Sequence, residues 1–257
     1  HGLDCVRPRP LVRLEDALRA VRELLREGHA AQEGEFLDCD GLRAAARPVQ
    51  EHLPVMAAVP LGERSCEVAG RAADGCHHAF SGTQAAYRFM AETVRAEAMR
   101  AGRDWRRLDI AAWVLLAVGP DPEAARRAAR CAVAVHAPFL PADLLRRNGV
   151  DPAELEPVAA AIAAGDVPAA VTLTRPHVVE RLSVAGTPGE VADRICGQLA
   201  HAGVNHVVAA LLDAAVVRAV SGMAVHGLPD VDGQLALLRD EVIPVVAAPG
   251  PLAAGAG

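Results

Sequence analysis

The chain has 257 residues, 52% of them hydrophobic and 3% aromatic, so it is long enough to bury a sizeable core made mainly of Ala, Val and Leu. Its formal net charge of −6 argues against a nucleic-acid-binding surface, and because it contains no lysine any anion must be held by arginine or by backbone N–H groups. The apolar runs are shorter than the roughly 20 residues of a membrane span, and the six cysteines form no C-x-x-C pair, which favours a cytoplasmic protein with reduced thiols.

Helical and extended patterns alternate along the first half of the chain. Leu14, Leu18, Val21 and Leu25 recur at helical spacing, and Gly28 ends that helix. The predicted elements are a helix over 11–27, extended pieces within 29–43, a buried strand over 53–59, a helix over 63–73, a short strand over 75–79 and a long helix over 82–102.

The second half begins with LDIAAWVLLAV, residues 108–118, a strand too apolar to be exposed on either face. Asp121 is expected to cap the next helix, with Pro122 at its first position, and Thr187 with Glu190 forms a capping box. The remaining predicted elements are two or three short helices in 137–182, a helix within 186–203, a strand over 206–212, a closing helix over 233–246 and a disordered tail over 248–257.

The alternation of strands and helices predicts a parallel sheet covered by helices, an α/β fold. Only four good strands follow residue 50, whereas a (β/α)8 barrel needs eight. The patterns therefore leave an open α/β sheet and an incomplete barrel equally supported. No repeat, linker or charge block divides residues 1–247, which predicts a single domain.

Several stretches resemble one known group of enzymes in order and spacing. They are RLEDALRAVRELLREG, EGEFLDCDGLR and RPVQEHLPVMAAVPLGERSCEVAGRAADG, and the group is the luciferase-like flavin oxidoreductase superfamily. It includes bacterial luciferase, flavin-dependent monooxygenases and reductases that use the deazaflavin coenzyme F420. A later stretch, RLSVAGTPGEVADRICGQLAHAGVNHVVAAL, is most similar to the methylenetetrahydromethanopterin reductase branch. The resemblance covers residues 11–246 and implies a TIM (β/α)8 barrel with a helical insertion, 137–182, before the last strand.

The resemblance also bears on the missing strands. Residue 11 resembles the start of the helix after the family's fourth strand, which implies an N-terminally truncated barrel. The family's proposed catalytic side chains lie mostly at the ends of the early strands, so no catalytic residue is assigned. Such a barrel has uncovered strand edges and an uncovered inner face. Exposed apolar surface of this kind predicts that the chain alone dimerises, aggregates or stays partly molten, and a homodimer is the expected assembly. The residues expected on that face include Val55, Ala57, Trp113 and Val207.

The turn PLGERS, residues 60–65, joins a predicted strand to a predicted helix and is the candidate binding site. A helix N-terminus offers unpaired N–H groups, Gly62 allows close approach, Arg64 can pair with a phosphate, and Ser65 adds a hydroxyl. On the residues alone, the simpler interpretation is that Ser65 caps the helix and Arg64 is solvated. The resemblance reverses this preference, because it implies that Gly62, Arg64 and Ser65 contact the cofactor phosphate and that Ala57 and Ala58 lie beside its ring.

Other motifs are less informative. His77 and His78 are adjacent on a predicted strand, so they point to opposite faces and cannot bind one metal ion together, and no metal site is predicted. The fingerprints of dinucleotide-binding, P-loop and α/β-hydrolase sites do not occur in the sequence.

Three functions remain open. The resemblance implies an oxidoreductase that transfers hydride from reduced F420 to a small or pterin-like substrate, and AGTPGEV favours this function. One alternative is a monooxygenase that uses reduced FMN and O2. The other is a non-catalytic homologue that acts only as an interaction partner. The sequence does not identify the substrate.

Overall fold

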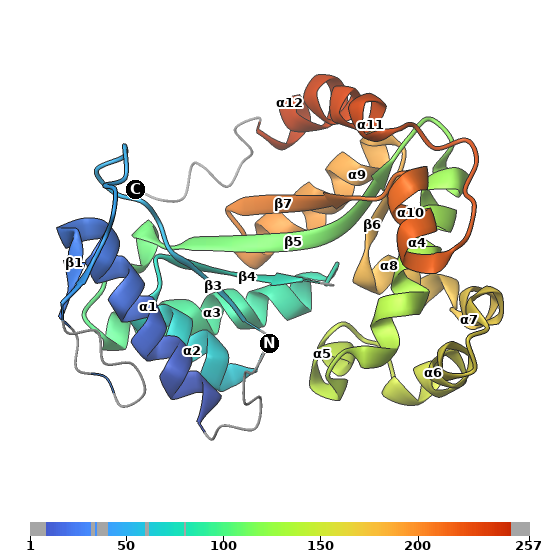
Figure 1. Cartoon of the computed structure of the whole chain (residues 1–257). Helices are drawn as coiled ribbons and strands as arrows, with labels where there is room; N and C mark the ends of the chain where they lie inside the picture. The colour runs from blue at the N-terminus through green and yellow to red at the C-terminus, as the bar shows by residue number, and fades with distance from the viewer. Residues whose placement is uncertain (1–8, 32–33, 35–40, 60–61, 80, 248–257) are drawn as a thin grey trace. The chain divides into compact units, whose positions relative to one another are not determined.

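The computed structural model describes residues 9–31, 34, 41–59, 62–79 and 81–247 (Figure 1). The chain divides into two compact units, the first unit being residues 1–78 and 89–111 and the second unit residues 79–88 and 112–257. The single domain expected from the sequence stays a prediction, and the tail 248–257 lies outside the described residues. Among the described helices, none is long and apolar enough to cross a membrane.

The first unit contains a parallel strand pair, an antiparallel ladder and helices that lie before and after them in the chain. β3 runs parallel to β4 with Ala57 opposite Cys76, and β1 pairs with β2 in antiparallel fashion. The elements that begin in this part of the chain are α1 (Pro10–Glu27), β1 (His29–Ala30), β2 (Leu42–Arg43), β3 (Met56–Ala58), α2 (Glu63–Ala72), β4 (Gly75–Ala79), α3 (Gln84–Arg100) and the 3-10 turn η1 (Trp105–Arg107).

Most of these elements match the sequence-based expectations. Gly28 ends α1 in the left-handed conformation, with φ of 78°, as the sequence predicts. The predicted strand over 53–59 is too long, because only Met56–Ala58 form β3 and Leu53 is 42% exposed.

Close packing and one buried carboxylate fix the position of α2 and of the two strands. A Cβ added at Gly70 of α2 would lie 2.5 Å from the carbonyl oxygen of Val94 in α3, so these helices approach too closely for any side chain there. Asp74, just before β4, accepts from the backbone N–H of Val55 at 3.0 Å and forms an ion pair with Arg22 at 2.8 Å. This carboxylate therefore joins α1 to the starts of both strands.

The second unit is built around the long strand β5 and the helix that follows it. Residues 116–118 of β5 pair in parallel with 184–186 of β6, and β7 also pairs with β5. The strands are β5 (Asp109–Val118), β6 (Val184–Gly186) and β7 (His206–Leu211). The α-helices are α4 (Pro122–His136), α5 (Ala142–Arg147), α6 (Glu156–Ala163), α7 (Val167–Leu173), α8 (Pro176–Leu182), α9 (Pro188–Arg194), α10 (Ala214–Ser221), α11 (Val231–Leu237) and α12 (Ile243–Val246). Short 3-10 or π turns lie at η2 (Ala137–Phe139), η3 (Pro152–Leu155), η4 (Ile195–Leu199), η5 (Ala200–Ala202) and η6 (Leu238–Val242).

The predicted helix caps of this unit are confirmed, but the predicted number of helices in residues 137–182 is wrong. The Asp121 side chain accepts from two N–H groups of α4, and the capping box of Thr187 and Glu190 begins α9. Residues 137–182 form the four helices α5 to α8 rather than two or three. Three of these helices carry a proline at the first or second position, where its missing N–H costs no intrahelical hydrogen bond. The sequence also gave no indication of β6.

The helices of 137–182 belong to the main hydrophobic core of the second unit. Buried side chains of these helices pack in one cluster with α4, whose buried face consists mostly of alanines. The residues contributed by 137–182 include Leu145, Leu155, Val158, Ala170, Val178 and Leu182. Since alanine adds little side-chain bulk, it allows α4 to approach its neighbours closely.

Candidate functional site

The turn before α2 is held by its own hydrogen bonds. Gly62 is the N-cap of α2, and its carbonyl oxygen accepts from the N–H groups of Ser65 at 3.1 Å and Cys66 at 3.2 Å. The Ser65 hydroxyl donates to the same carbonyl at 2.7 Å, and Ser65 is 3% exposed. Ser65 is therefore not a side-chain N-cap, because it accepts no backbone N–H. It stabilises the turn from within. The contact of Ser65 with a phosphate stays a prediction. Pro60 and Leu61 lie outside the described residues.

The outer side of the same turn is open. Gly62, Glu63 and Arg64 are exposed, and the N–H groups of Glu63 and Arg64 have no intrahelical partner at the start of a helix. Among the described residues, Arg64 makes no hydrogen bond or ion pair. Within the described part of the chain, a Cβ added at Gly62 would meet only the Ser65 Oγ, at 3.7 Å. Free N–H groups, a cationic side chain and open space fit an anion, although the Glu63 carboxylate in the same turn opposes one.

The strand pair of β3, which precedes this turn, and β4, which follows α2, has two distinct faces. Ala57 is 1% exposed and lies opposite Cys76, which is 0% exposed, whereas Ala58 is exposed and lies opposite His77. Burial raises the pKa of the Cys76 thiol, and the nearby Cys66 of α2 raises it further. The face that carries Ala57 and Cys76 is therefore the one covered by helices.

This arrangement corrects one expectation about Ala57. The sequence predicted that Ala57 lies on an uncovered inner face, but its side chain lies on the helix-covered face. Because successive side chains in a strand alternate, Ala58 lies on the opposite face. A contact between Ala57 and a cofactor ring would have to use its backbone.

His77 and His78 lie on opposite faces of β4, as expected. His78 is 6% exposed, and its Nδ1 lies 2.6 Å from the carbonyl oxygen of Val59. Burial lowers the pKa of His78 to about 4, so the imidazole is neutral at pH 7. His77 is half-buried, lies in the middle of β4 and shares a face with Ala58, the last residue of β3. The sequence indicated no binding role for His77, and only the strand register with Ala58 identifies it as a candidate site residue.

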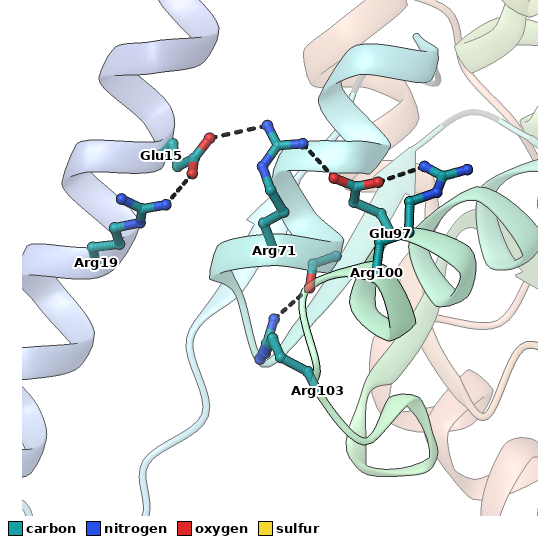
Figure 2. Close-up of polar contacts among 7 residues, drawn as sticks. Glu15, Arg19, Arg71, Glu97, Arg100 and Arg103 are labelled. Carbon is teal, nitrogen blue, oxygen red and sulfur yellow. Dashed lines mark hydrogen bonds and ion pairs between the residues drawn. The ribbon is translucent and has the colours of Figure 1, made fainter.

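An alternating chain of charges holds α2 to its neighbouring helices (Figure 2). Arg71 of α2 donates to Glu15 of α1 at 3.0 Å and to Glu97 of α3 at 2.7 Å. These bonds raise the pKa of Arg71, and the bonds from Arg71 and Arg100 lower the pKa of Glu97. Arg103 adds hydrogen bonds of 2.6 Å to the carbonyl oxygens of Gly70 and Ala73. The helix that presents the turn is thus tied at both its outer face and its end.

Metal-binding chemistry finds no support in the described part of the chain. No three His, Cys, Asp or Glu side chains come together there in a way that suits a metal ion. No disulfide joins the cysteines that the structure describes, which are Cys66, Cys76, Cys131 and Cys196.

Comparison with known proteins gives a consistent set of relatives. A family model described as luciferase-like monooxygenase matches residues 1–206. The 5,10-methylenetetrahydromethanopterin reductase of Methanolobus tindarius is 27% identical over 201 residues, which cover 78% of this chain and 60% of that protein. The same enzyme of Methanopyrus kandleri is 26% identical over 236 residues, which cover 91% of this chain and 63% of that protein. The chain therefore spans about three fifths of the length of these relatives.

Two solved structures share the fold. The structure of coenzyme F420 dependent tetrahydromethanopterin reductase from Methanopyrus kandleri matches with a TM-score of 0.77 and 25% identity, over 91% of this chain and 63% of that one. An F420-dependent secondary alcohol dehydrogenase in complex with an F420-acetone adduct matches with a TM-score of 0.62 and 18% identity, over 90% of this chain and 60% of that one.

Proposed function

Because this chain belongs to the luciferase-like monooxygenase family, we propose that it is an oxidoreductase that binds coenzyme F420. The proposed reaction is hydride transfer from reduced F420 to a small or pterin-like substrate, of the class named by the methylenetetrahydromethanopterin reductases among its relatives. Support comes from these reductases and from the likeness to the F420-dependent reductase structure. The chain spans only part of each relative, so the activity and substrate are proposals.

The fold agrees with this family. It is the luciferase-like TIM-barrel type that the sequence predicts, with parallel strand pairs and covering helices. In such folds the loops at the carboxyl ends of the strands form the active site. The turn at residues 62–65 follows β3, and His77 lies opposite Ala58, the last residue of β3.

The single observation that carries the cofactor proposal is the open turn before α2. The exposed N–H groups of Glu63 and Arg64 and the Arg64 guanidinium would bind the cofactor phosphate, and Gly62 would leave space for it. Ser65 would keep the turn in shape through its bond to Gly62. F420 supplies the hydride when bound, while the protein binds and orients it and excludes water. Ala58 and His77 are the side chains proposed to lie beside the ring, with Ala57 contributing backbone.

A second candidate is a monooxygenase that uses reduced FMN and O2. The description of the family model favours it, since it names monooxygenases. FMN also carries a phosphate, so the turn before α2 serves either cofactor equally well. The two functions differ in the ring that is bound and in the need for O2.

We also propose that the protein acts in the cytoplasm as a homodimer on a small-molecule substrate. These statements rest on the sequence-based expectations given above. Light scattering of the purified chain measures its oligomeric state, and a monodisperse monomer would contradict the homodimer.

The experiment that tests the phosphate turn is a calorimetric titration with F420. Arg64→Ala should weaken binding by about 1.5–3 kcal/mol, the value of a hydrogen bond to a charged group. Arg218→Ala, which removes an exposed arginine from α10, is the matched control and should leave the affinity unchanged. Equal affinities of the wild type and Arg64→Ala would remove Arg64 from the site.

Gly62→Ala separates binding from folding. Gly62 has φ of −80° and ψ of 140°, which any residue adopts, and an added Cβ has room among the described residues. The Tm should therefore stay unchanged while F420 binding weakens, because the methyl group would occupy the space proposed for the phosphate. Unchanged F420 affinity in a variant with unchanged Tm would contradict the proposed position of the phosphate.

A further inference from the structure

The described residues of the β4–α3 loop, 81–83, form several hydrogen bonds with other parts of the second unit. The Gly82 N–H donates to the carbonyl oxygen of Arg181 at 2.9 Å, and the Gly82 carbonyl oxygen accepts from Nε of Arg194 at 3.3 Å. The Ser81 carbonyl oxygen accepts from the Tyr87 hydroxyl at 3.2 Å. The backbone of this loop is therefore bonded to α3, to the end of α8 and to α9.

The loop is also packed too closely to move without breaking these contacts. A Cβ added at Gly82 would lie 3.0 Å from the carbonyl oxygen of Ser183 and 3.1 Å from that of Arg181. Ser81 is 0% exposed and Thr83 is 4% exposed. The loop therefore lies with its backbone against residues 181–183, and a hydroxyl group on each side of Gly82 is buried.

One buried amide, Asn148 at the end of α5, satisfies both hydroxyl groups. Asn148 is 0% exposed, and its Oδ1 accepts from the Thr83 hydroxyl at 2.9 Å. Its Nδ2 donates to Oγ of Ser81 at 3.1 Å and to the carbonyl oxygen of Leu144 at 3.0 Å. Only an amide supplies an acceptor and two donors at one place, so a carboxylate or an apolar side chain leaves buried partners unsatisfied.

We propose that Asn148 is a positioning residue for a ligand-binding loop within the second unit, residues 81–83 after β4. The loop that leaves a parallel strand at its carboxyl end contributes to ligand binding in α/β folds of this type. Asn148 does not contact the ligand, but it holds Ser81 and Thr83 and thereby fixes the loop in the conformation that binds F420. This inference rests on the proposed function for the identity of the ligand. The helices of 137–182 then contribute to the site through a buried polar contact as well as through packing.

The matched variants separate positioning from general loss of stability. Asn148→Ala removes all three side-chain hydrogen bonds, and Thr83→Val removes one of them with little change in volume. Val158→Ala, in α6, removes buried apolar volume from the same helical segment without touching the loop. All four proteins, including the wild type, are compared by F420 titration below the unfolding temperature of the least stable one.

Two readouts are measured on the full chain. We expect Asn148→Ala to raise the Kd for F420 about five- to tenfold and Thr83→Val to raise it about two- to fivefold, in the range of single buried hydrogen bonds. Val158→Ala should leave the Kd unchanged. Amide hydrogen exchange of Gly82, measured without cofactor, should become faster in Asn148→Ala and Thr83→Val and stay unchanged in Val158→Ala.

The outcomes distinguish this inference from the proposed function. A wild type that does not bind F420 overturns the proposed function and, with it, the role of Asn148 at an F420 site. If the wild type binds F420 and both loop variants keep its affinity, Asn148 has only a structural role and the inference is overturned. If Asn148→Ala does not fold, Thr83→Val alone decides, since it retains two of the three Asn148 hydrogen bonds.

Discussion

The buried imidazole of His78 makes a specific prediction about pH and stability. His78 is 6% exposed, and burial lowers its pKa in the folded protein to about 4, while an unfolded histidine has a pKa near 6.5. Between these two values the unfolded chain binds a proton at this position and the folded chain does not. The free energy of unfolding therefore decreases as the pH falls from about 6.5 towards 4.

The size of this effect follows from the shift. Each pH unit between about 6.5 and about 4 lowers the free energy of unfolding by about 1.4 kcal/mol. Lowering the pH from about 7.5 to about 5 crosses about 1.5 units of this range and should therefore remove about 2 kcal/mol of stability through His78 alone. His78→Asn carries no titrating group at this position, and its amide can still donate to the Val59 carbonyl oxygen that lies 2.6 Å from Nδ1. The other titrating groups are the same in both proteins, so their contributions cancel in the comparison.

The assay is denaturant unfolding of the wild type and His78→Asn at both pH values. The wild type should lose about 2 kcal/mol more than the variant when the pH is lowered. Equal losses in the two proteins would refute the reasoning, because they would mean that His78 is protonated equally in the folded and unfolded states.

Two further predictions concern packing and the Asp74 ion pair. Gly70→Ala should reduce the free energy of unfolding by about 1–3 kcal/mol, because the added Cβ would lie 2.5 Å from a backbone oxygen of α3. In its control, Gly197→Ala, the added Cβ has no described atom within 4 Å, so this substitution should be neutral or stabilising. Equal denaturation midpoints of Gly70→Ala and Gly197→Ala would contradict the close approach of α2 and α3. Asp74→Asn should cost about 1–3 kcal/mol, because Arg22 at 2.8 Å loses its partly buried carboxylate. If Asp74→Asn has the same denaturation midpoint as the wild type, this ion pair contributes nothing to the free energy of unfolding.

Much of the fold could be predicted because its signals are local. Apolar spacing and Gly28 placed the first helix at 11–27, and α1 spans Pro10–Glu27. The apolar run at 108–118 predicted β5, which spans Asp109–Val118. The cap chemistry of Asp121 and Thr187 is also local, since each side chain bonds to N–H groups two or three residues away.

The features that the sequence did not indicate depend on distant contacts. β6 has only three residues and exists because it pairs with 116–118, far away in the chain. Asn148 reads as an ordinary polar residue at a helix end, and its importance depends on Ser81 and Thr83, more than sixty positions earlier. Such long-range partners leave no pattern in a single sequence.

The candidate site was predicted only in outline. The sequence located the turn at Gly62 and Arg64, where the structure has exposed groups at the start of α2. It did not indicate that the Ser65 hydroxyl is already bonded within the turn, nor that Ala58 and His77, rather than Ala57, share the face away from the helices. Assigning faces requires the strand register and the covering helices, and a three-residue strand is too short to show an alternating pattern.

The most direct test of the central proposal is a titration of the purified wild-type chain with F420 and with FMN under identical conditions. Tight binding of F420, at least about tenfold stronger than that of FMN and weakened by Arg64→Ala, is the result that the proposed function predicts. Preferential binding of FMN would contradict the F420-dependent function and support the monooxygenase, and binding of neither cofactor would contradict both.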